Sequence, residues 1–350
     1  MCLTNEEIKK IKKELEECKK PLFFFHDDPD GLCSFLQFYR YKREGKGIIV
    51  KSNPVIDEKF IRKVKEYGPD KIFILDIAVV EQEFIDSVKQ RVVWIDHHTV
   101  LKRSNVLYFN PRKNSPKSNP PVSYICNKVI NDDFWIALAG FTGDWYFPEN
   151  IGFFMKKFPD LLSESITKPE DALYNSRLGL LTRVFAFILK GTTHEAMKAV
   201  KVLTRIKDYN EILNQTTSQG RFIWKRYMKI NKEYEALLKD ALKNTKNSIL
   251  VYKYDDNKMS FTGDLANELQ YRFPEKVIIV CRRKSGEMKC SLRSKDLVLP
   301  EIIQKALNGL EGRGGGHEHA SGLVVKEENF GRFIENFKKE AESLSIGKNN

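Results

Sequence analysis

The chain has 350 residues, 41% of them hydrophobic, and a formal net charge of +12. This apolar fraction excludes global disorder, and the length favours about two domains. The excess of lysine and arginine favours a polyanionic partner, because these side chains neutralise phosphates. Solvated faces of mixed charge would give a similar composition, so the charge alone does not identify a ligand.

The cysteines are scattered along the chain, and none belongs to a CxxC pair. This distribution favours buried thiols in a reducing compartment over a disulfide framework. The charged segment from Asn5 to Lys10 predicts a helix rather than a signal peptide. No apolar run approaches the roughly 20 residues that a membrane span requires. We therefore expect a cytoplasmic protein without a membrane partner.

The first part of the chain alternates short apolar runs with helical patterns. The runs predict strands at 22–25, 47–50, 72–75 and 92–95, and the segments between them predict helices at 32–43, 57–67 and 82–89. Strands that alternate with helices are typical of a parallel, doubly wound sheet. We therefore expect an α/β domain over residues 1–160.

The pattern changes after this domain. Apolar spacings of three and four predict helices at 178–189, 195–206 and 218–243, so we interpret 161–245 as a helical connector. The last part, 246–345, predicts a smaller α/β domain, with strands at 248–252, 277–281 and 289–292, a hairpin turn at 284–287, and helices at 261–271 and 301–310.

Acidic and histidine side chains follow three of the predicted strands: His26-x-Asp28-x-Asp30-Gly31, then Asp76, then Asp96-His97-His98. Ligands bind at the carboxyl ends of strands in such sheets, so we expect these side chains to meet in one crevice. The carboxylates would repel one another without a cation. Mixed carboxylate and imidazole ligands suit manganese or another first-row ion, with magnesium as the alternative. Taken singly, the first motif and Asp76 also fit an ordinary helix cap or turn, and the histidine pair also fits an ordinary surface or core pair.

These motifs, together with Gly143-Asp144, resemble the four motifs of the DHH phosphoesterases. The segment 314–322, GGGHEHASG, resembles the GGGHxxAAG signature of the DHHA1 domain, with Ser321 where alanine is usual. The segment 291–294, Ser-Leu-Arg-Ser, resembles the Arg-Ser strand of the same domain. The resemblance covers about 20–160 and 245–345, and it implies a catalytic DHH domain joined to a DHHA1 domain.

The resemblance also implies a binuclear metal site. One ion would be held by His26, Asp28 and Asp76, and the other by Asp30, Asp76, His97 and Asp144. Asp96 would orient His97, as groups behind a metal ligand commonly do. His98 would face the scissile phosphate and stabilise its charge. Two divalent ions would activate a water for hydrolysis, so no side-chain nucleophile is required.

The glycine run of the second domain has two interpretations. It could be a flexible turn, or its backbone N–H groups could approach an anion closely. In the second interpretation the phosphate or terminal nucleotide of the substrate would be bound by Arg293, Ser294, Gly314, Gly315, Gly316 and His317.

The family that the chain resembles includes enzymes for several substrate classes. RecJ-like exonucleases act on single-stranded DNA or RNA, nanoRNases act on short oligonucleotides or cyclic dinucleotides, and manganese pyrophosphatases carry a different C-terminal domain. The charge, and the lack of a stretch for the OB-fold domain of bacterial RecJ, favour a compact archaeal-type exonuclease with a role such as DNA repair. Some of these enzymes work with replication or repair proteins. A non-catalytic replication scaffold is the rival interpretation, and the complete ligand set argues against it.

The helix predicted at 218–243 carries basic and aromatic side chains that could line a strand-binding channel: Trp224, Lys225, Arg226, Tyr227, Lys229 and Lys232. An amphipathic helix with a solvated basic face is the alternative interpretation.

Overall fold

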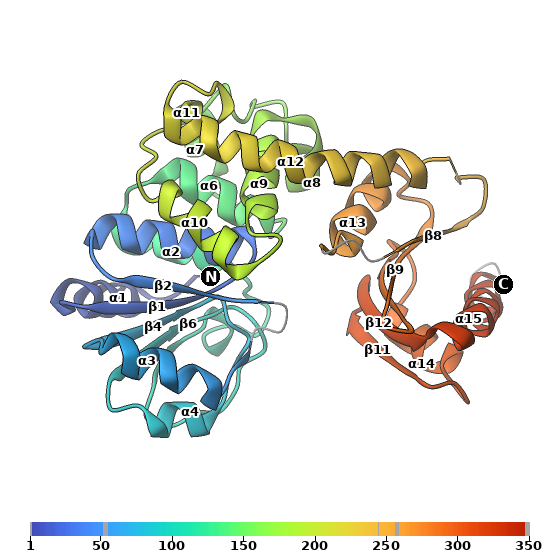
Figure 1. Cartoon of the computed structure of the whole chain (residues 1–350), viewed down its shortest axis with the longest axis horizontal. Helices are drawn as coiled ribbons and strands as arrows, with labels where there is room; N and C mark the ends of the chain where they lie inside the picture. Colours follow the sequence, from blue (N-terminus) through green and yellow to red (C-terminus); the bar gives the residue numbers. More distant parts are fainter. Residues whose placement is uncertain (1, 52–54, 244, 256–258, 347–350) are drawn as a thin grey trace. The chain divides into compact units, whose positions relative to one another are not determined.

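The computed structural model describes residues 2–51, 55–243, 245–255 and 259–346. The chain forms two compact units, Met1–Met228 and Lys229–Asn350 (Figure 1). Helix α12 (Ser218–Ala241) begins in the first unit and ends in the second. No helix in the described part of the chain is long and apolar enough to cross a membrane.

The first unit is built on a parallel five-stranded sheet in the order β2–β1–β4–β6–β7. Its strands are β1 (Pro21–His26), β2 (Lys46–Val50), β4 (Lys71–Leu75), β6 (Arg91–Ile95) and β7 (Leu107–Phe109). A separate parallel pair consists of β3 (Val55–Ile56) and β5 (Val79–Val80). The predicted α/β fold with a parallel sheet is confirmed, and β7 is a strand that the sequence pattern did not indicate.

Helices cover both faces of this sheet because its strands are apolar on both sides. Phe24 packs with residues of α3 and α4 on one face, whereas its neighbour Phe23 contacts Phe35 of α2 on the other. The helices of this part are α1 (Asn5–Glu17), α2 (Pro29–Lys42), α3 (Ile61–Tyr67), α4 (Gln82–Ser87), α5 (Val122–Ile130) and α6 (Phe134–Gly143), with single 3-10 turns at η1 (Glu58–Phe60) and η2 (Pro111–Lys113).

The helices predicted as a connector pack largely into the first unit. Thr182 of α9 donates a hydrogen bond to the carbonyl of Ala139 in α6 at 3.2 Å, and Phe185 contacts Trp135. The first compact unit therefore extends past residue 160, because the apolar face of α9 is buried against α6. The connector helices in this unit are α8 (Pro169–Asn175), α9 (Arg177–Ile188), α10 (Thr193–Leu203) and α11 (Tyr209–Leu213), and α7 (Ile151–Lys157) precedes them.

Two side chains of the suggested strand-binding channel are engaged within the protein. Arg226 donates hydrogen bonds to the carbonyls of Ile188 at 2.9 Å and Lys190 at 2.6 Å. Tyr227 is 3% exposed. Arg226 therefore satisfies carbonyls at the end of α9, where a helix leaves acceptors unpaired. These two side chains therefore take part in the packing of α12 and do not belong to a solvated basic face.

The second unit contains a mixed five-stranded sheet in the order β11–β12–β10–β9–β8, antiparallel except for the pair β8–β9. Helices α14 and α15 cover one face, and α13 packs on β9 and β10. The strands are β8 (Ile249–Asp255), β9 (Val277–Lys284), β10 (Glu287–Arg293), β11 (Gly312–His317) and β12 (Ala320–Lys326). The helices are α13 (Thr262–Arg272), α14 (Leu299–Ala306) and α15 (Phe330–Ile346), with a 3-10 turn at η3 (Glu327–Asn329).

The hairpin between β9 and β10 turns at Ser285 and Gly286. Both residues have positive φ, 53° and 73°, as a two-residue turn between antiparallel strands favours. The hairpin places Cys281 directly opposite Cys290, and the two form a disulfide. The expectation that the cysteines remain thiols is wrong for this pair, since strand pairing brings together two residues that look unrelated in sequence. Cys18, Cys33 and Cys126 are buried free thiols.

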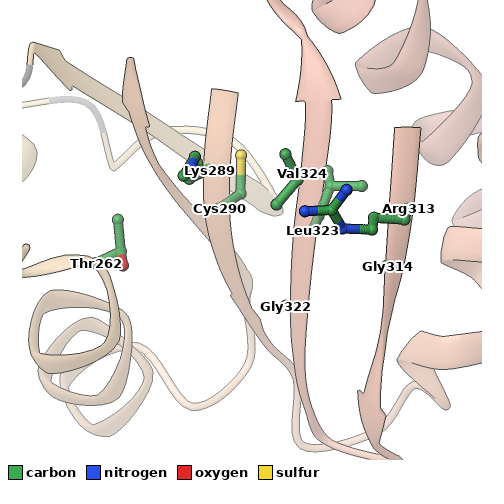
Figure 2. A pocket seen from close by; sticks show the side chains of 8 residues that line it. All are labelled: Thr262, Lys289, Cys290, Arg313, Gly314, Gly322, Leu323 and Val324. Carbon is green, nitrogen blue, oxygen red and sulfur yellow. The ribbon is translucent and has the colours of Figure 1, made fainter. Parts of the chain in front are cut away.

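The glycine run lies in a strand, β11, rather than in a flexible turn. A Cβ on Gly314 would lie 2.6 Å from the side chain of Ile303 in α14, and Gly316 has a φ of 143°. Gly315 has no atom within 4 Å of its Cβ position. Packing and backbone conformation therefore account for two of these glycines, but not for Gly315. Figure 2 shows Gly314 on β11 beside Gly322 on β12.

Candidate metal centre

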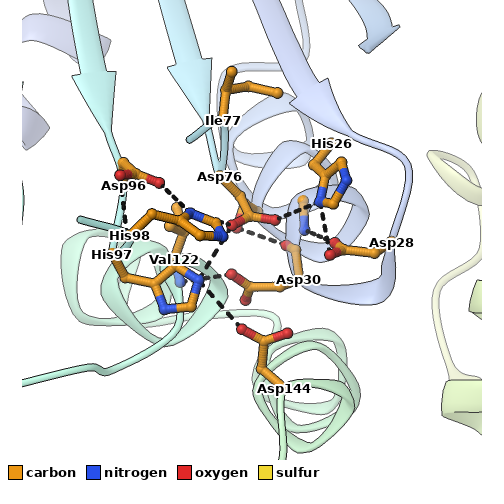
Figure 3. Close-up of polar contacts among 12 residues, drawn as sticks. His26, Asp28, Asp30, Asp76, Ile77, Asp96, His97, His98, Val122 and Asp144 are labelled. Carbon is orange, nitrogen blue, oxygen red and sulfur yellow. Dashed lines mark hydrogen bonds and ion pairs between the residues drawn. The ribbon is translucent and has the colours of Figure 1, made fainter. Parts of the chain in front are cut away.

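The carboxyl ends of three neighbouring strands place the predicted ligands side by side (Figure 3). His26 is the last residue of β1, Asp76 follows β4, and Asp96 begins the triplet after β6. Parallel pairing aligns these strand ends at one edge of the sheet. Asp144 comes from the end of α6. The structure thus gathers residues that are up to 118 positions apart, as the difference between 144 and 26 gives.

Asp76 occupies the middle of the cluster. One carboxylate oxygen lies 3.3 Å from Nδ1 of His26, and the other lies 3.4 Å from Nε2 of His97. The side chain is 1% exposed, and neither oxygen makes a hydrogen bond of acceptable geometry with the described residues. Its φ is 57°, in the left-handed region that costs energy for a residue with a side chain. Such strain at a buried carboxylate without hydrogen bonds is typical of a functional position.

The other ligand atoms surround Asp76. Among the described residues, three groups bring their nitrogen and oxygen atoms within 4.8 Å of one another: His26, Asp28 and Asp76; Asp30, His97 and Asp144; and Asp76, His97 and His98. The first two groups match the two predicted ligand sets, apart from the shared Asp76. Nε2 of His97 also lies 3.3 Å from Asp144.

The start of α2 fixes two of the acidic ligands. Asp28 is the N-cap of this helix: one of its oxygens accepts the N–H of Gly31 at 2.9 Å, and the other lies 2.7 Å from Nδ1 of His26. The helix-cap and ligand interpretations of this motif are therefore compatible. Gly31 is required by close packing, because a Cβ there would lie 2.6 Å from the carbonyl oxygen of His26.

Asp30 is held by a segment that the sequence did not single out. The N–H groups of Val122 and Ser123, at the start of α5, each donate to its carboxylate at 2.8 Å, and the hydroxyl of Ser123 donates as well. Asp30 is fully buried. Its position is therefore set by a helix N-terminus, which favours a negative charge.

Asp96 orients His98, not His97. Its carboxylate lies 2.7 Å from Nδ1 of His98 and accepts the backbone N–H of the same residue at 3.0 Å. Asn110 donates to Asp96 at 3.3 Å and to the carbonyl of His98 at 3.0 Å. The prediction that Asp96 orients His97 is wrong, because the chain turns after β6 and the Asp96 carboxylate folds over the residue two positions on, as in an Asx turn. Nδ1 of His97 has no hydrogen bond among the described residues.

Burial and neighbouring charges shift the pKa values of several groups in the cluster. Burial, followed by the charge of Asp76, raises the pKa of Asp30 to about 7. Burial and the charge of Asp30 also raise the pKa of Asp144 well above its usual range. Burial lowers the pKa of His97, but the carboxylates of Asp76 and Asp144 outweigh it and raise the pKa to about 10. The protein alone would balance these charges only by taking up protons.

A divalent cation fits this donor set. The buried oxygens of Asp76 and Nδ1 of His26 lack hydrogen bonds among the described residues, which is costly unless another group satisfies them. Carboxylate oxygens and imidazole nitrogens are ligands of first-row divalent ions. The cluster therefore has the atoms, the burial and the charge that such an ion requires.

The predicted substrate-binding residues of the second unit lie around the ends of β10 and β11. Arg293 donates to the side chain of Asn267 at 2.7 Å. Ser294 is buried, and its hydroxyl oxygen accepts the N–H of Leu297 at 3.1 Å, so it shapes the turn after β10. His317 is exposed at the end of β11.

No sequence pattern singled out Trp145. This residue follows Asp144, is 40% exposed and has a φ of 57°. An exposed indole in a left-handed conformation beside a ligand is unusual for a side chain with only a packing role. A positive φ has no signal in a single sequence unless glycine or asparagine occupies the position.

Comparisons with known proteins support the fold on both halves of the chain. Residues 246–343 match the family model described as the DHHA1 domain. RecJ in complex with Mn²⁺ from Thermus thermophilus matches with a TM-score of 0.70 and 16% identity, over 99% of this chain and 56% of the RecJ chain. This chain therefore spans little more than half the length of that protein. No curated protein sequence matches the chain.

Two further structures match over almost their whole length. An exonuclease RecJ bound to manganese has a TM-score of 0.65 and 14% identity, over 97% of this chain and 95% of that one. A pGpG-specific phosphodiesterase from Vibrio cholerae has a TM-score of 0.51 and 14% identity, over 93% of this chain and 99% of that one. The resemblance to the DHH/DHHA1 proteins is thus confirmed: the chain has a RecJ-like fold, and its C-terminal part is a DHHA1 domain.

Proposed function

We propose, from a RecJ-like fold that ends in a DHHA1 domain, that this chain is a metal-dependent phosphodiesterase that removes nucleotides from the ends of single-stranded DNA or RNA. One observation carries the proposal: Asp76, buried and strained, directs one oxygen toward His26 and the other toward His97. An ordinary buried aspartate would be hydrogen-bonded on both oxygens. A carboxylate between two groups of ligands suits a bridge between two ions.

The residues of the cluster divide into two ligand sets. His26, Asp28 and Asp76 would hold one ion, and Asp30, His97 and Asp144 would hold the other. Asp76 would serve the second set as well, because one of its oxygens lies 3.4 Å from Nε2 of His97. When bound, two divalent ions, with manganese preferred over magnesium, supply the Lewis acidity that activates water and neutralises the phosphate oxygens. The hydrogen bonds from the N–H groups of Val122 and Ser123 fix the orientation of the Asp30 carboxylate.

The side chain of His98 lies at the exposed side of the cluster and contacts the substrate. Asp96 accepts a hydrogen bond from Nδ1 of His98. Burial lowers the pKa of His98, but Asp96 outweighs it and raises the pKa, which favours a second proton on Nε2 that is donated to a phosphate oxygen. The side chain of His98 is 36% exposed, whereas that of Asp96 is fully buried. His98 thus meets the charge that develops on the phosphate, and Asp96 holds the ring for that purpose.

The second unit binds the end of the substrate. Arg293 and His317 are the groups that meet a terminal phosphate, since a guanidinium and an exposed imidazole both donate hydrogen bonds to anions. Gly315 lets the backbone approach it, because no neighbouring atom accounts for a glycine there. Ser294, Gly314 and Gly316 shape this end of the sheet.

The decisive experiment measures hydrolysis of end-labelled substrates in the presence of manganese. The substrates are a dinucleotide, a five-mer, and long single strands of DNA and of RNA. We expect stepwise shortening of the long strands. Asp76→Ala removes ligands from both sets and should abolish the activity, whereas Asp255→Asn removes a carboxylate that is 83% exposed in the other unit and should retain it.

The panel also decides between the rival functions. The fold likeness to the pGpG-specific phosphodiesterase favours, as the second candidate, an enzyme for very short or cyclic oligonucleotides. Cleavage of the dinucleotide and five-mer with long strands left intact would establish that candidate. Cleavage of none of the substrates, by protein that binds manganese, would overturn both and favour a scaffold.

A further inference from the structure

Strand pairing in the second unit arranges three rows of residues across β10, β12 and β11. The first row is Arg293, Ala320 and His317; the second is Ser291, Gly322 and Gly315; the third is Lys289, Val324 and Arg313. Residues that lie opposite one another share a face, and so do residues two apart along a strand. All three rows therefore lie on one face of the sheet, which we call the row face.

The opposite face of the same strands is closed. Met288, Leu292 and Leu323 are buried beneath α14 and α15. On the row face, α13 packs on β9 and β10. Arg313, His317 and Gly322, on the far strands β11 and β12, are exposed. A Cβ on Gly322 would meet a single atom, at 4.0 Å, and a Cβ on Gly315 would meet none within that distance. The middle row is therefore a shallow floor made of small residues.

A groove of about 420 Å³ lies over this floor. It is lined by Thr262 at the start of α13, by Lys289 and Arg313, and by residues of β12 that include Gly322 and Val324. Figure 2 shows the guanidinium of Arg313 extending from β11 across β12 toward β10, where Lys289 lies. Two cations thus border the groove on its two sides.

The charge of the groove favours an anion. Arg313 is exposed, and Lys289 lies 3.5 Å from Glu287 with 41% of its side chain exposed. A single lysine with one acidic neighbour would be an ordinary surface pair. The arginine opposite it leaves a net positive edge, and the glycine floor lets a flat or bulky group lie close to the sheet.

The spacing of the rows suits a polymer. Lys289 and Arg293 are four residues apart on one strand, a distance of about 14 Å. A stacked nucleic-acid strand advances about 3.4 Å per nucleotide, so this span covers roughly four stacked nucleotides and fewer extended ones. A stacked dinucleotide held at Arg293 would not reach the Lys289 row.

We propose that the row face is a track for a single nucleic-acid strand. The terminal nucleotide lies at Arg293 and His317, the strand continues over Ser291, Gly315 and Gly322, and Lys289 and Arg313 pair with phosphates farther along. The track rests on the proposed function and gives it a substrate class: strands long enough to span the rows bind more tightly than dinucleotides.

The test compares Lys289→Ala/Arg313→Ala with a matched double variant, Lys305→Ala/Arg332→Ala. The control removes one lysine and one arginine from α14 and α15, on the other side of the sheet. Binding of a fluorescent twenty-nucleotide strand is measured by anisotropy over a range of salt, with a chelator present to prevent turnover. We expect the track variant to bind about tenfold more weakly, with a salt slope smaller by about 1.4 because two phosphate contacts are lost.

A second readout separates this inference from the proposed function. With manganese, the ratio of kcat/KM for the long strand to that for the dinucleotide should fall about tenfold in the track variant and stay constant in the control. If the wild-type protein hydrolyses neither substrate, the proposed function fails, yet weaker binding by the track variant alone would still support the track. Equal affinities and salt slopes in the track variant and the control would overturn it.

Gly322→Val tests the floor without changing the charge. Valine suits a strand, and the space at this position is open, so the melting temperature should not fall. We expect weaker binding of the twenty-nucleotide strand with an unchanged salt slope. Wild-type affinity in this variant would mean that the strand does not cross the floor, and the track would be rejected.

Discussion

Asp96 and His98 form a hydrogen-bonded pair at the exposed side of the cluster. The carboxylate of Asp96 lies 2.7 Å from Nδ1 of His98 and also accepts its backbone N–H at 3.0 Å. Asp96 is fully buried, so its charge is poorly solvated and favours a proton on the facing nitrogen. The pair therefore fixes both the orientation of the ring and which nitrogen faces outward.

The first prediction concerns this pair. In Asp96→Asn the amide presents a donor or a weaker acceptor to Nδ1, so the ring loses its preferred proton position. We expect kcat to fall about 10–100-fold while the affinity for manganese is retained. The measurement is single-strand hydrolysis at saturating manganese, together with manganese binding by calorimetry.

A double-mutant cycle shows whether Asp96 acts through His98. If it does, Asp96→Asn/His98→Ala should lose no more activity than His98→Ala alone, because the carboxylate has nothing left to orient. Losses that multiply would mean that Asp96 serves another group, such as Tyr108, whose hydroxyl lies 3.4 Å away.

The second prediction is that manganese stabilises the first unit. At a free concentration about 100 times its Kd, an ion bound to the native state alone adds about 2.7 kcal/mol. For a unit of this size we expect a rise in Tm of roughly 5–10 °C. Differential scanning calorimetry with manganese, and after chelation, measures the shift. If the Tm of the first unit is the same with and without manganese, the proposed metal site is contradicted.

Asp144→Asn tests the same site, because it should change the stabilisation by manganese and the stability of the metal-free protein in different ways. The amide is a weaker ligand, so the manganese-dependent rise in Tm should be largely lost. The substitution also removes one negative charge beside Asp30, and the metal-free protein should therefore be no less stable than the wild type. A large loss of metal-free stability would indicate that Asp144 is a structural residue.

Most of the candidate site could be predicted from the sequence, because its residues follow the ends of predicted strands. Apolar runs that stop at His26, Asp76 and Asp96 indicate topology and chemistry together, because a parallel sheet aligns those ends. The groups that support the ligands left no such pattern. Ser123 donates to Asp30 across 93 positions of sequence, and no local periodicity connects a helix start to a distant carboxylate.

The directions of the side chains could not be predicted from the sequence either. The triplet after β6 indicated the ligands but not that Asp96 would contact His98 instead of His97, which depends on the backbone path after the strand. The strand β11 was also hidden, because glycine disfavours strands and its pairing with β12 decides the outcome. The resemblance pointed to the three glycines. The structure shows that packing explains Gly314 and backbone conformation explains Gly316, whereas neither explains Gly315.

The third prediction concerns Asp70, which joins the end of α1 to the loop before β4. Its carboxylate accepts the N–H groups of Lys19 at 2.6 Å and Lys20 at 2.8 Å, and the thiol of Cys18 at 2.9 Å. Burial raises the pKa of Asp70, but these donors outweigh it and lower the pKa to about 2.

A lowered pKa means that the ionised form stabilises the fold. This contribution is complete above the unfolded pKa of about 3.9 and is lost as the pH falls through about 2. Because Asp70 is exposed, we expect Asp70→Asn to cost only about 1 kcal/mol at neutral pH. Urea denaturation at pH 7 and near pH 2 measures the difference, which should shrink in acid. A difference that is constant with pH would assign the effect to packing.

The last prediction concerns Gly31, where the path of the backbone determines the metal site. A Cβ at this position would lie 2.6 Å from the carbonyl oxygen and 2.7 Å from the backbone nitrogen of His26, and neither atom can move without shifting β1. In Gly31→Ala the start of α2 must therefore withdraw from the strand, and Asp28 and Asp30 move with it. We expect manganese affinity to fall at least 10-fold and stability to fall by about 1–3 kcal/mol, as for other overpacked sites.

Gly152→Ala is the matched control, because no atom lies within 4 Å of the Cβ position at Gly152 in α7. Alanine favours a helix over glycine by about 0.5–1 kcal/mol, so this variant should be as stable as the wild type or slightly more so, with unchanged manganese affinity. If Gly31→Ala binds manganese as tightly as this control does, the ligands of α2 do not depend on the close approach to His26, and Asp28 and Asp30 lose their place in the proposed site.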